Sequence, residues 1–148
     1  MLVEYGFTLP AARNPWDEAC LDPYLCPLPS PAQRALLDEA GFWRNSQLDA
    51  RTACYRTLPA LRLLCLGPAR WRAVLDGDRA EDRDRDAVDA ALLRVLRACD
   101  DDVRAKMADI GPPGGPDDDH AHAALRARWR QIEQLVATAI ARLQENQT

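Results

Sequence analysis

The stretch VDAALLRVLRACDDDVRAKMADIGPPGGP, residues 88–116, carries the longest periodic pattern in the 148-residue chain. Apolar side chains recur in it every three or four positions, which places them on one face of an α-helix. These residues are Val88, Leu92, Val95, Leu96, Cys99, Val103, Met107 and Ile110. The pattern predicts a long amphipathic helix, and the prolines and glycines of 111–116 predict its end.

A second long helix is predicted after this turn. The aspartates of 117–119 supply capping oxygens and negative charge at its start. Its apolar face is formed by Leu125, Trp129, Ile132, Val136, Ala139, Ile140 and Leu143. Because the turn is short, we expect an antiparallel hairpin in which residues equally far from the turn meet. This pairing should bring Leu96 or Cys99 near Ile132 or Val136.

A shorter helix is predicted to begin at Ser30. Ser30 can accept hydrogen bonds as the N-cap, Pro31 suits the first helical position, and Gln33 completes a capping box. Gly41 can adopt the left-handed conformation that ends a helix. These signals bound one helix within residues 30–41.

The segment 58–66, LPALRLLCL, is apolar nearly all round and predicts a central helix in which Leu61 is fully buried. Gly67 and the proline after it should end this helix. Pro59 is unfavourable in a helix interior, so the helix should begin or kink there. A further short helix is expected over 69–75.

The first residues alternate between β-compatible and other side chains, which predicts a short strand over 1–9. The prolines between residues 10 and 31 predict an irregular connector. The predicted fold class is therefore mainly α: a helical bundle with a short N-terminal strand and an irregular connector.

Composition bounds the class of protein. A chain of this length with 47% hydrophobic residues is expected to form one domain. Its longest apolar run is far shorter than the roughly 20 residues of a membrane-spanning helix, and no signal peptide pattern opens the chain. Five cysteines without C-x-x-C spacing predict neither a disulfide scaffold nor a zinc site. We expect an intracellular protein, cytoplasmic or nuclear, without a membrane partner.

The net charge of −4 argues against nonspecific binding to nucleic acid, which depends on clustered basic residues. Acidic residues gather within 76–89, 100–102 and 117–119, where they can attract a lysine-rich partner or solvate loops; solvated loops are the more common case. His120 and His122 are two positions apart and do not share a helical face, so no metal site is predicted.

The arginines divide into two groups. Arg126, Arg128 and Arg130 are spaced by two and spread around the last helix, which predicts solvated surface. Arg62 is a lone charge on an apolar helix, which predicts a side chain that snorkels to water or forms a structural ion pair.

Five segments resemble the C-terminal region of SET-domain protein-lysine methyltransferases of the Rubisco large-subunit methyltransferase type. Residues 2–7 read LVEYGF and residues 14–17 read NPWD, followed by Leu21 and Asp22; further along, 36–42 reads LLDEAGF and 55–64 reads YRTLPALRLL. In that family a YGF segment ends the catalytic domain, an NPxD turn follows, and a helical substrate-binding domain completes the protein. The specificity lies in the order and spacing of these segments.

The resemblance implies that 1–29 is the end of a SET domain with its connector and that 30–148 is a helical substrate-binding domain. It implies a protein substrate as partner and S-adenosylmethionine as cofactor of the full-length family, with no cofactor for this chain alone, because the cofactor cradle and the catalytic tyrosine segment have no counterpart here. Tyr5 and Phe7 would line the cofactor site and the lysine channel; as strand residues they can equally be core. Two alternatives stay open: a free-standing helical interaction module without methyltransferase activity, and a small helical protein unrelated to methylation.

Overall fold

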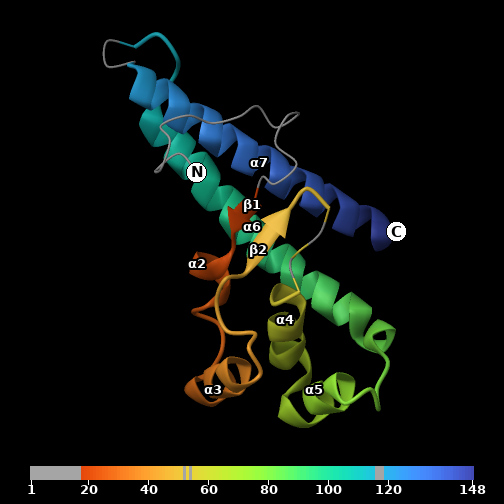
Figure 1. Cartoon of the computed structure of the whole chain (residues 1–148). Helices are drawn as coiled ribbons and strands as arrows, with labels where there is room; N and C mark the ends of the chain where they lie inside the picture. The colour runs from red at the N-terminus through yellow and green to blue at the C-terminus, as the bar shows by residue number, and fades with distance from the viewer. Residues whose placement is uncertain (1–17, 52, 54, 116–118) are drawn as a thin grey trace.

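Two long helices, α6 (Arg85–Ile110) and α7 (His120–Asn146), lie side by side along the molecule and run in opposite directions (Figure 1). The computed structural model describes residues 18–51, 53, 55–115 and 119–148. The predicted hairpin is confirmed: Gly111, with φ 77°, ends α6, and the Asp119 side chain caps α7 by accepting the backbone N–H of His122.

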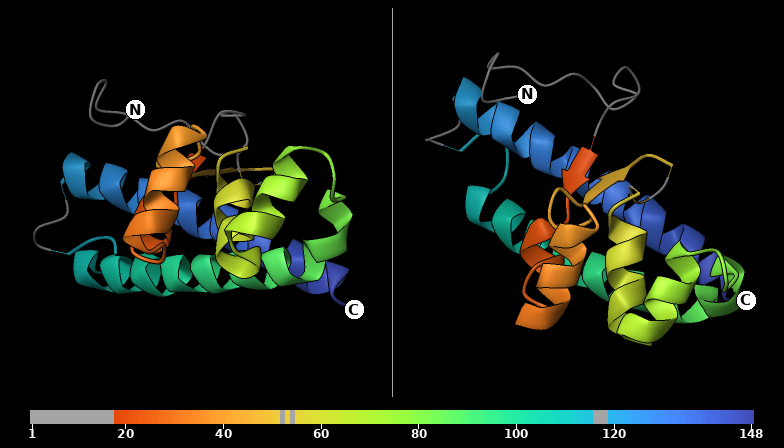
Figure 2. Two further views of the ribbon diagram at one scale, coloured as in Figure 1. Left: turned by 90° about the horizontal axis from the view of Figure 1, so that it is seen from below. Right: turned by 60° about the horizontal axis from the view of Figure 1, so that its bottom comes forward.

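The other elements are short and cover one side of this hairpin (Figure 2). In chain order they are β1 (Glu18–Cys20), α2 (Asp22–Leu25), α3 (Pro31–Glu39), β2 (Gln47–Asp49), α4 (Thr57–Leu66), α5 (Pro68–Leu75) and the 3₁₀ turn η2 (Glu81–Asp84). The fold is mainly helical, as the sequence predicts. The expected strand over 1–9 lies outside the described residues.

Helix α3 begins and ends where its sequence signals place it. Ser30 Oγ accepts the N–H of Gln33, and Gln33 Oε1 accepts the N–H of Ser30 at 2.9 Å, which completes the capping box. Gly41 follows the helix with φ 80°, the left-handed conformation that glycine adopts without strain. Leu37 on its inner face is completely buried.

Helix α4 ends at Gly67 as predicted, but it begins at Thr57, two residues before Pro59. Pro59 therefore neither starts nor kinks the helix. It lies in the first turn, where its missing N–H would have no intrahelical partner. Its carbonyl accepts the Trp71 indole N–H at 3.0 Å, which ties α5 to α4. Leu61 is completely buried, as expected.

The core lies where α4, the short elements and α7 pack around α6. Its completely buried side chains include Leu21, Leu37, Leu61, Leu63, Leu96, Val103 and Val136. We expected α4 to cover the apolar seam of the hairpin. It packs chiefly on α6, whereas β1 and β2 lie against α7. The seam is thus shared between a helix and a two-stranded ribbon.

The predicted irregular connector contains regular structure. Glu18–Cys20 pairs antiparallel with Gln47–Asp49, and α2 follows directly. The Asp22 carboxylate accepts the backbone N–H groups of Asn45 and Ser46 at 2.9 and 2.8 Å, and so supports the left-handed conformations of Arg44 and Asn45. Strands of three residues are too short to show an alternating pattern, so they could not be predicted from the sequence.

The arginines at the start of α7 also differ from expectation. Arg126 is buried and donates to the carbonyls of Gly111 and Pro112, which holds the hairpin turn against α7. Arg128 donates to the carbonyl of Glu18, joining α7 to β1. Only Arg130 is exposed as predicted. Arg126 and Arg128 therefore join neighbouring chain segments by donating hydrogen bonds to backbone carbonyls of the turn and of the β-ribbon.

Candidate functional site

A cavity of about 370 Å³ opens where the loop after β2 meets α4, the start of α6 and the end of α7. Its apolar lining includes Leu48, Leu58, Val88, Leu92, Leu135 and Ala139. Its charged lining consists of Asp49, Arg51, Arg62, Glu81, Asp82, Arg85, Asp89 and Arg142. We call this the α4–α7 cavity. A volume of this size, with a mixed apolar and charged lining, is typical of ligand pockets.

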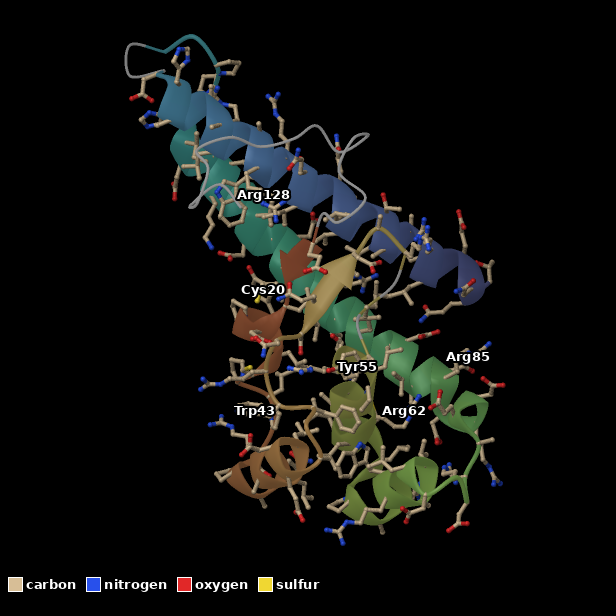
Figure 3. The ribbon with its side chains drawn as sticks, viewed as in Figure 1. Cys20, Trp43, Tyr55, Arg62, Arg85 and Arg128 are labelled. Atoms are coloured by element: carbon tan, nitrogen blue, oxygen red, sulfur yellow. The ribbon has the colours of Figure 1, made fainter. Side chains whose placement is uncertain are left out.

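Arg62 is the most deeply buried charge in this lining. It projects from α4, a helix that is apolar nearly all round, and Figure 3 shows it between α4 and the start of α6. Its residue is 7% exposed. The expected ion pair is present but weak: Nη2 lies 4.0 Å from Glu81 Oε2, whose side chain is 74% exposed. Nε has no hydrogen-bond partner among the described residues. Burying a guanidinium with so few partners costs free energy.

Asp84, whose charge Arg62 also influences, is already occupied by another arginine. Asp84, at the end of η2, accepts Arg79 Nε at 2.7 Å and Arg79 Nη2 at 2.6 Å. These hydrogen bonds are the main reason that the pKa of Asp84 lies below its ordinary value, and the charge of Arg62 adds to the lowering. Because the fork of Arg79 takes both oxygens, Asp84 compensates Arg62 only from a distance.

The lining contains three further arginines, Arg51, Arg85 and Arg142, and all three are exposed. Arg142, on α7, donates through Nη1 to the carbonyls of Ala50 and Arg51 at 2.7 and 3.1 Å, and no carboxylate of the described residues lies within ion-pair distance of it. Arg85 is paired with Asp82 at the exposed start of α6. Arg142 therefore brings a charge that its own contacts, both neutral, leave uncompensated.

Carboxylates are present in the lining as well. Asp89 is half-buried, and burial raises its pKa while Arg85 acts in the opposite direction. Asp49 accepts the backbone N–H of Arg51 at 2.6 Å. Glu81 and Asp82 are exposed. The cavity thus places an undersatisfied cation at its buried end and carboxylates mostly toward solvent.

One other buried side-chain atom in the described part of the chain lacks a partner, Asp100 Oδ1. The charge of Asp100 is nevertheless compensated, because its other oxygen lies 2.8 Å from Arg104 Nη2. Asp100 also lies outside the lining of the α4–α7 cavity. Arg62 is therefore the unusual group.

A second, mainly apolar cavity of about 260 Å³ lies on the other side of α4, lined in part by Tyr24, Leu61, Cys65 and Val95. The neighbouring Cys99 has its pKa raised to about 11 by burial, and it stays a thiol at neutral pH. Burial also raises the pKa of Cys65, the cysteine of this lining, so its thiol is not activated as a nucleophile.

The site residues suggested by resemblance, Tyr5 and Phe7, lie outside the described residues and stay predictions. A buried arginine beside carboxylates does not match the sulfonium of S-adenosylmethionine, which aromatic faces suit better. Methyl transfer is therefore not assigned to the α4–α7 cavity.

The histidines belong to a helix terminus. His122 contacts the Asp119 carboxylate through both its backbone N–H and Nδ1, at 2.9 and 3.0 Å. Across the described ranges, histidine, cysteine, aspartate and glutamate nowhere gather as three possible ligands of one metal ion. None of the described helices combines the length and the apolar character needed to cross a membrane.

Sequence reasoning singled out Arg62 as a lone charge on an apolar helix but missed the cavity around it. Sequence reasoning did not single out Arg142, because one arginine in an amphipathic helix is an ordinary surface feature. Comparisons of this chain with models of protein families, with curated proteins and with solved structures found no match.

Proposed function

We propose that this chain is the protein-recognition part of a SET-domain protein-lysine methyltransferase of the Rubisco large-subunit methyltransferase type, and that it is not catalytic alone. The observation that carries the proposal is the order of the family-like segments. Two of them, 36–42 and 55–64, lie on α3 and α4 and contribute Leu37 and Leu61 to the core. In the described part, the resemblance therefore concerns residues that build a helical body.

Recognition is the role that such a body can perform. Its helices surround a cavity with a buried cation, and the residues proposed to meet the cofactor and the lysine, Tyr5 and Phe7, precede it in sequence. On this proposal S-adenosylmethionine serves the full-length enzyme, the partner is a protein in the cytoplasm or nucleus, and neither nucleic acid nor a membrane is engaged.

The first test is binding of S-adenosylmethionine to the chain as it stands. We expect isothermal titration to show no saturable heat, since the cofactor cradle of the family has no counterpart in this sequence. Saturable binding in the low micromolar range would contradict the non-catalytic assignment and point to Tyr5 and Phe7 as sufficient contacts.

The second test concerns the catalytic partner. The coding DNA in frame upstream of Met1 should be read and any extension expressed with the chain. We expect the extended protein, and not the chain alone, to transfer labelled methyl groups from S-adenosylmethionine to protein lysines. The absence of an extension that encodes SET motifs, or an extended protein without transfer, would count against the proposal.

A second candidate is a free-standing helical interaction module. The observation in its favour is that described residues from β1 to α7 contribute to one hydrophobic cluster, which runs from Ala19 on β1 to Val136 on α7. A cluster of that extent can support a stable body without a catalytic domain. The upstream sequence distinguishes the two candidates directly.

A further inference from the structure

We propose that the α4–α7 cavity is a receptor for a carboxylate group of a protein partner, with Arg62 as the buried cation and Arg142 as the cation at the mouth. The proposal rests on the recognition role proposed above and names the chemistry that the partner would present. Its basis is a cavity on whose wall a nine-tenths buried guanidinium is undersatisfied.

The guanidinium of Arg62 needs a further hydrogen-bond acceptor. A guanidinium has five N–H donors and no acceptor, yet Nε is unpartnered and Glu81 lies at the outer limit of an ion pair. A carboxylate can accept two parallel N–H bonds from such a fork. A ligand oxygen in the cavity would supply the contact that Glu81 provides only weakly.

The second step concerns the charge of the ligand. Four carboxylates share the lining with four arginines, so the cavity as a whole is close to neutral. A dianionic phosphate would meet stronger repulsion from Asp49, Asp89 and Glu81 than a carboxylate with one charge. A cationic ligand would meet Arg62 and Arg142. Burial decides in favour of an anion, because Arg62 is buried whereas Glu81 and Asp82 are exposed.

The third step concerns the rest of the ligand. Leu58, Leu92 and Leu135 line the same cavity and suit the methylenes of a glutamate side chain or the last side chain of a protein. The shared chemistry is a carboxylate on a short aliphatic stem. Its source is either an acidic side chain or a chain terminus.

The test reads Arg62 directly. In ¹⁵N spectra of the full chain, the arginine Nε–H resonances are followed while amino-acid derivatives are added. N-acetyl-glutamate amide tests the side chain, and N-acetyl-leucine with a free carboxylate tests the terminus. The matched neutral probes are N-acetyl-glutamine amide and N-acetyl-leucine amide. N-acetyl-lysine amide and inorganic phosphate complete the set.

We expect at least one carboxylate probe to shift the Arg62 Nε–H resonance saturably, and its neutral match to bind at least about tenfold more weakly, as a lost charge-assisted hydrogen bond implies. Which carboxylate binds more tightly identifies the source. Equal binding of charged and neutral probes, or tighter binding of phosphate or the lysine derivative, would overturn the proposal.

Variants distinguish binding in the α4–α7 cavity from a general effect of surface charge. Arg62→Gln and Arg142→Gln should each weaken the carboxylate probe by about tenfold, whereas the exposed Arg97→Gln should leave it unchanged. Glu81→Gln should strengthen binding, because it removes the competing carboxylate. If Arg62→Gln unfolds, Arg142→Gln and Glu81→Gln still decide. Unchanged affinity in both variants would refute the assignment.

The outcome is distinguishable from failure of the proposed function. Carboxylate binding by this chain without methyl transfer by any extended protein would retain the receptor and remove the methyltransferase. Methyl transfer by an extended protein whose Arg62 Nε–H resonance shifts with none of the carboxylate probes would retain the methyltransferase and remove the receptor.

Discussion

Two polar clusters lie on α6 and its neighbours, and they differ in how completely their charges are matched. In the first, Asp102 accepts the Tyr24 hydroxyl at 2.5 Å and Lys106 Nζ at 2.9 Å, and Lys106 also lies 4.8 Å from the centre of the Trp129 ring. This cluster joins α2, α6 and α7. In the second, Arg62 has one distant carboxylate and an unpartnered Nε.

The difference separates a fastening from a receptor. A cluster whose donors and acceptors are mutually satisfied stabilises the contact between its elements and leaves little for a ligand. A buried cation with an unmet donor lowers stability instead, and proteins retain such groups most often where they function. The first cluster is centred on α6, through Asp102 and Lys106, and the second joins α4, through Arg62, to η2, through Glu81.

The largest expected effect on stability comes from α4, the helix that carries Arg62. Leu61 is completely buried beside Arg62, so Leu61→Ala should lower the free energy of unfolding by about 2 to 5 kcal/mol. Urea denaturation measures it. Arg130→Ala, at an exposed position on α7, is the matched control and should change stability by less than about 0.5 kcal/mol. Equal losses for the two variants would mean that α4 is not central.

The next largest loss of stability is expected in the cluster of Tyr24, Asp102 and Lys106. Tyr24→Phe keeps the ring and removes the hydroxyl that donates to Asp102, so it should cost about 1 kcal/mol. Asp102 keeps Lys106 as a partner, which limits the loss. Tyr55→Phe, at a residue that is 67% exposed, is the control. A Tyr24→Phe protein as stable as the control would show that this cluster does not hold α2 to α6.

The helices could be predicted because each is specified by neighbouring residues. Ser30 and Gln33 form the capping box, Gly41 and Gly111 end helices, and apolar spacing runs through α6. These signals act over one or two helical turns, within reach of a sequence pattern.

The missed features depend on residues far apart in the chain. Strand β1 exists because it pairs with β2. Gln47, the first residue of β2, comes 29 positions after Glu18, the first residue of β1. Arg128 is fixed by the carbonyl of Glu18. The α4–α7 cavity combines β2, α4, α6 and α7, so the sequence flagged Arg62 alone and gave no indication of its partners.

Acid should weaken the fastening. The hydrogen bonds from Tyr24 and Lys106 hold the pKa of Asp102 below its ordinary value. A carboxyl with a depressed folded-state pKa stabilises the fold above its unfolded pKa of roughly 3.9, and this contribution is lost as the pH falls through the folded value. The difference in unfolding free energy between the original chain and Tyr24→Phe should therefore shrink as the pH falls below about 5 and through the folded-state pKa of Asp102. A difference that grows in acid would contradict this sign.

The smallest expected change is the one that most sharply separates the two regions. Arg62→Met keeps much of the length of the side chain, fills the same space with apolar atoms, and removes a buried charge whose only ion-pair partner among the described residues is Glu81 at 4.0 Å. Replacing poorly compensated buried charges with apolar groups is commonly neutral or stabilising, so we expect the free energy of unfolding to stay the same or to rise by up to about 1 kcal/mol. Urea denaturation of both variants gives the comparison. Tyr24→Phe should lower the free energy of unfolding, whereas Arg62→Met should leave it unchanged or raise it. A loss of about 3 kcal/mol or more would mean that Arg62 is a structural partner after all, and the case for an acceptor supplied by a ligand would fall with it.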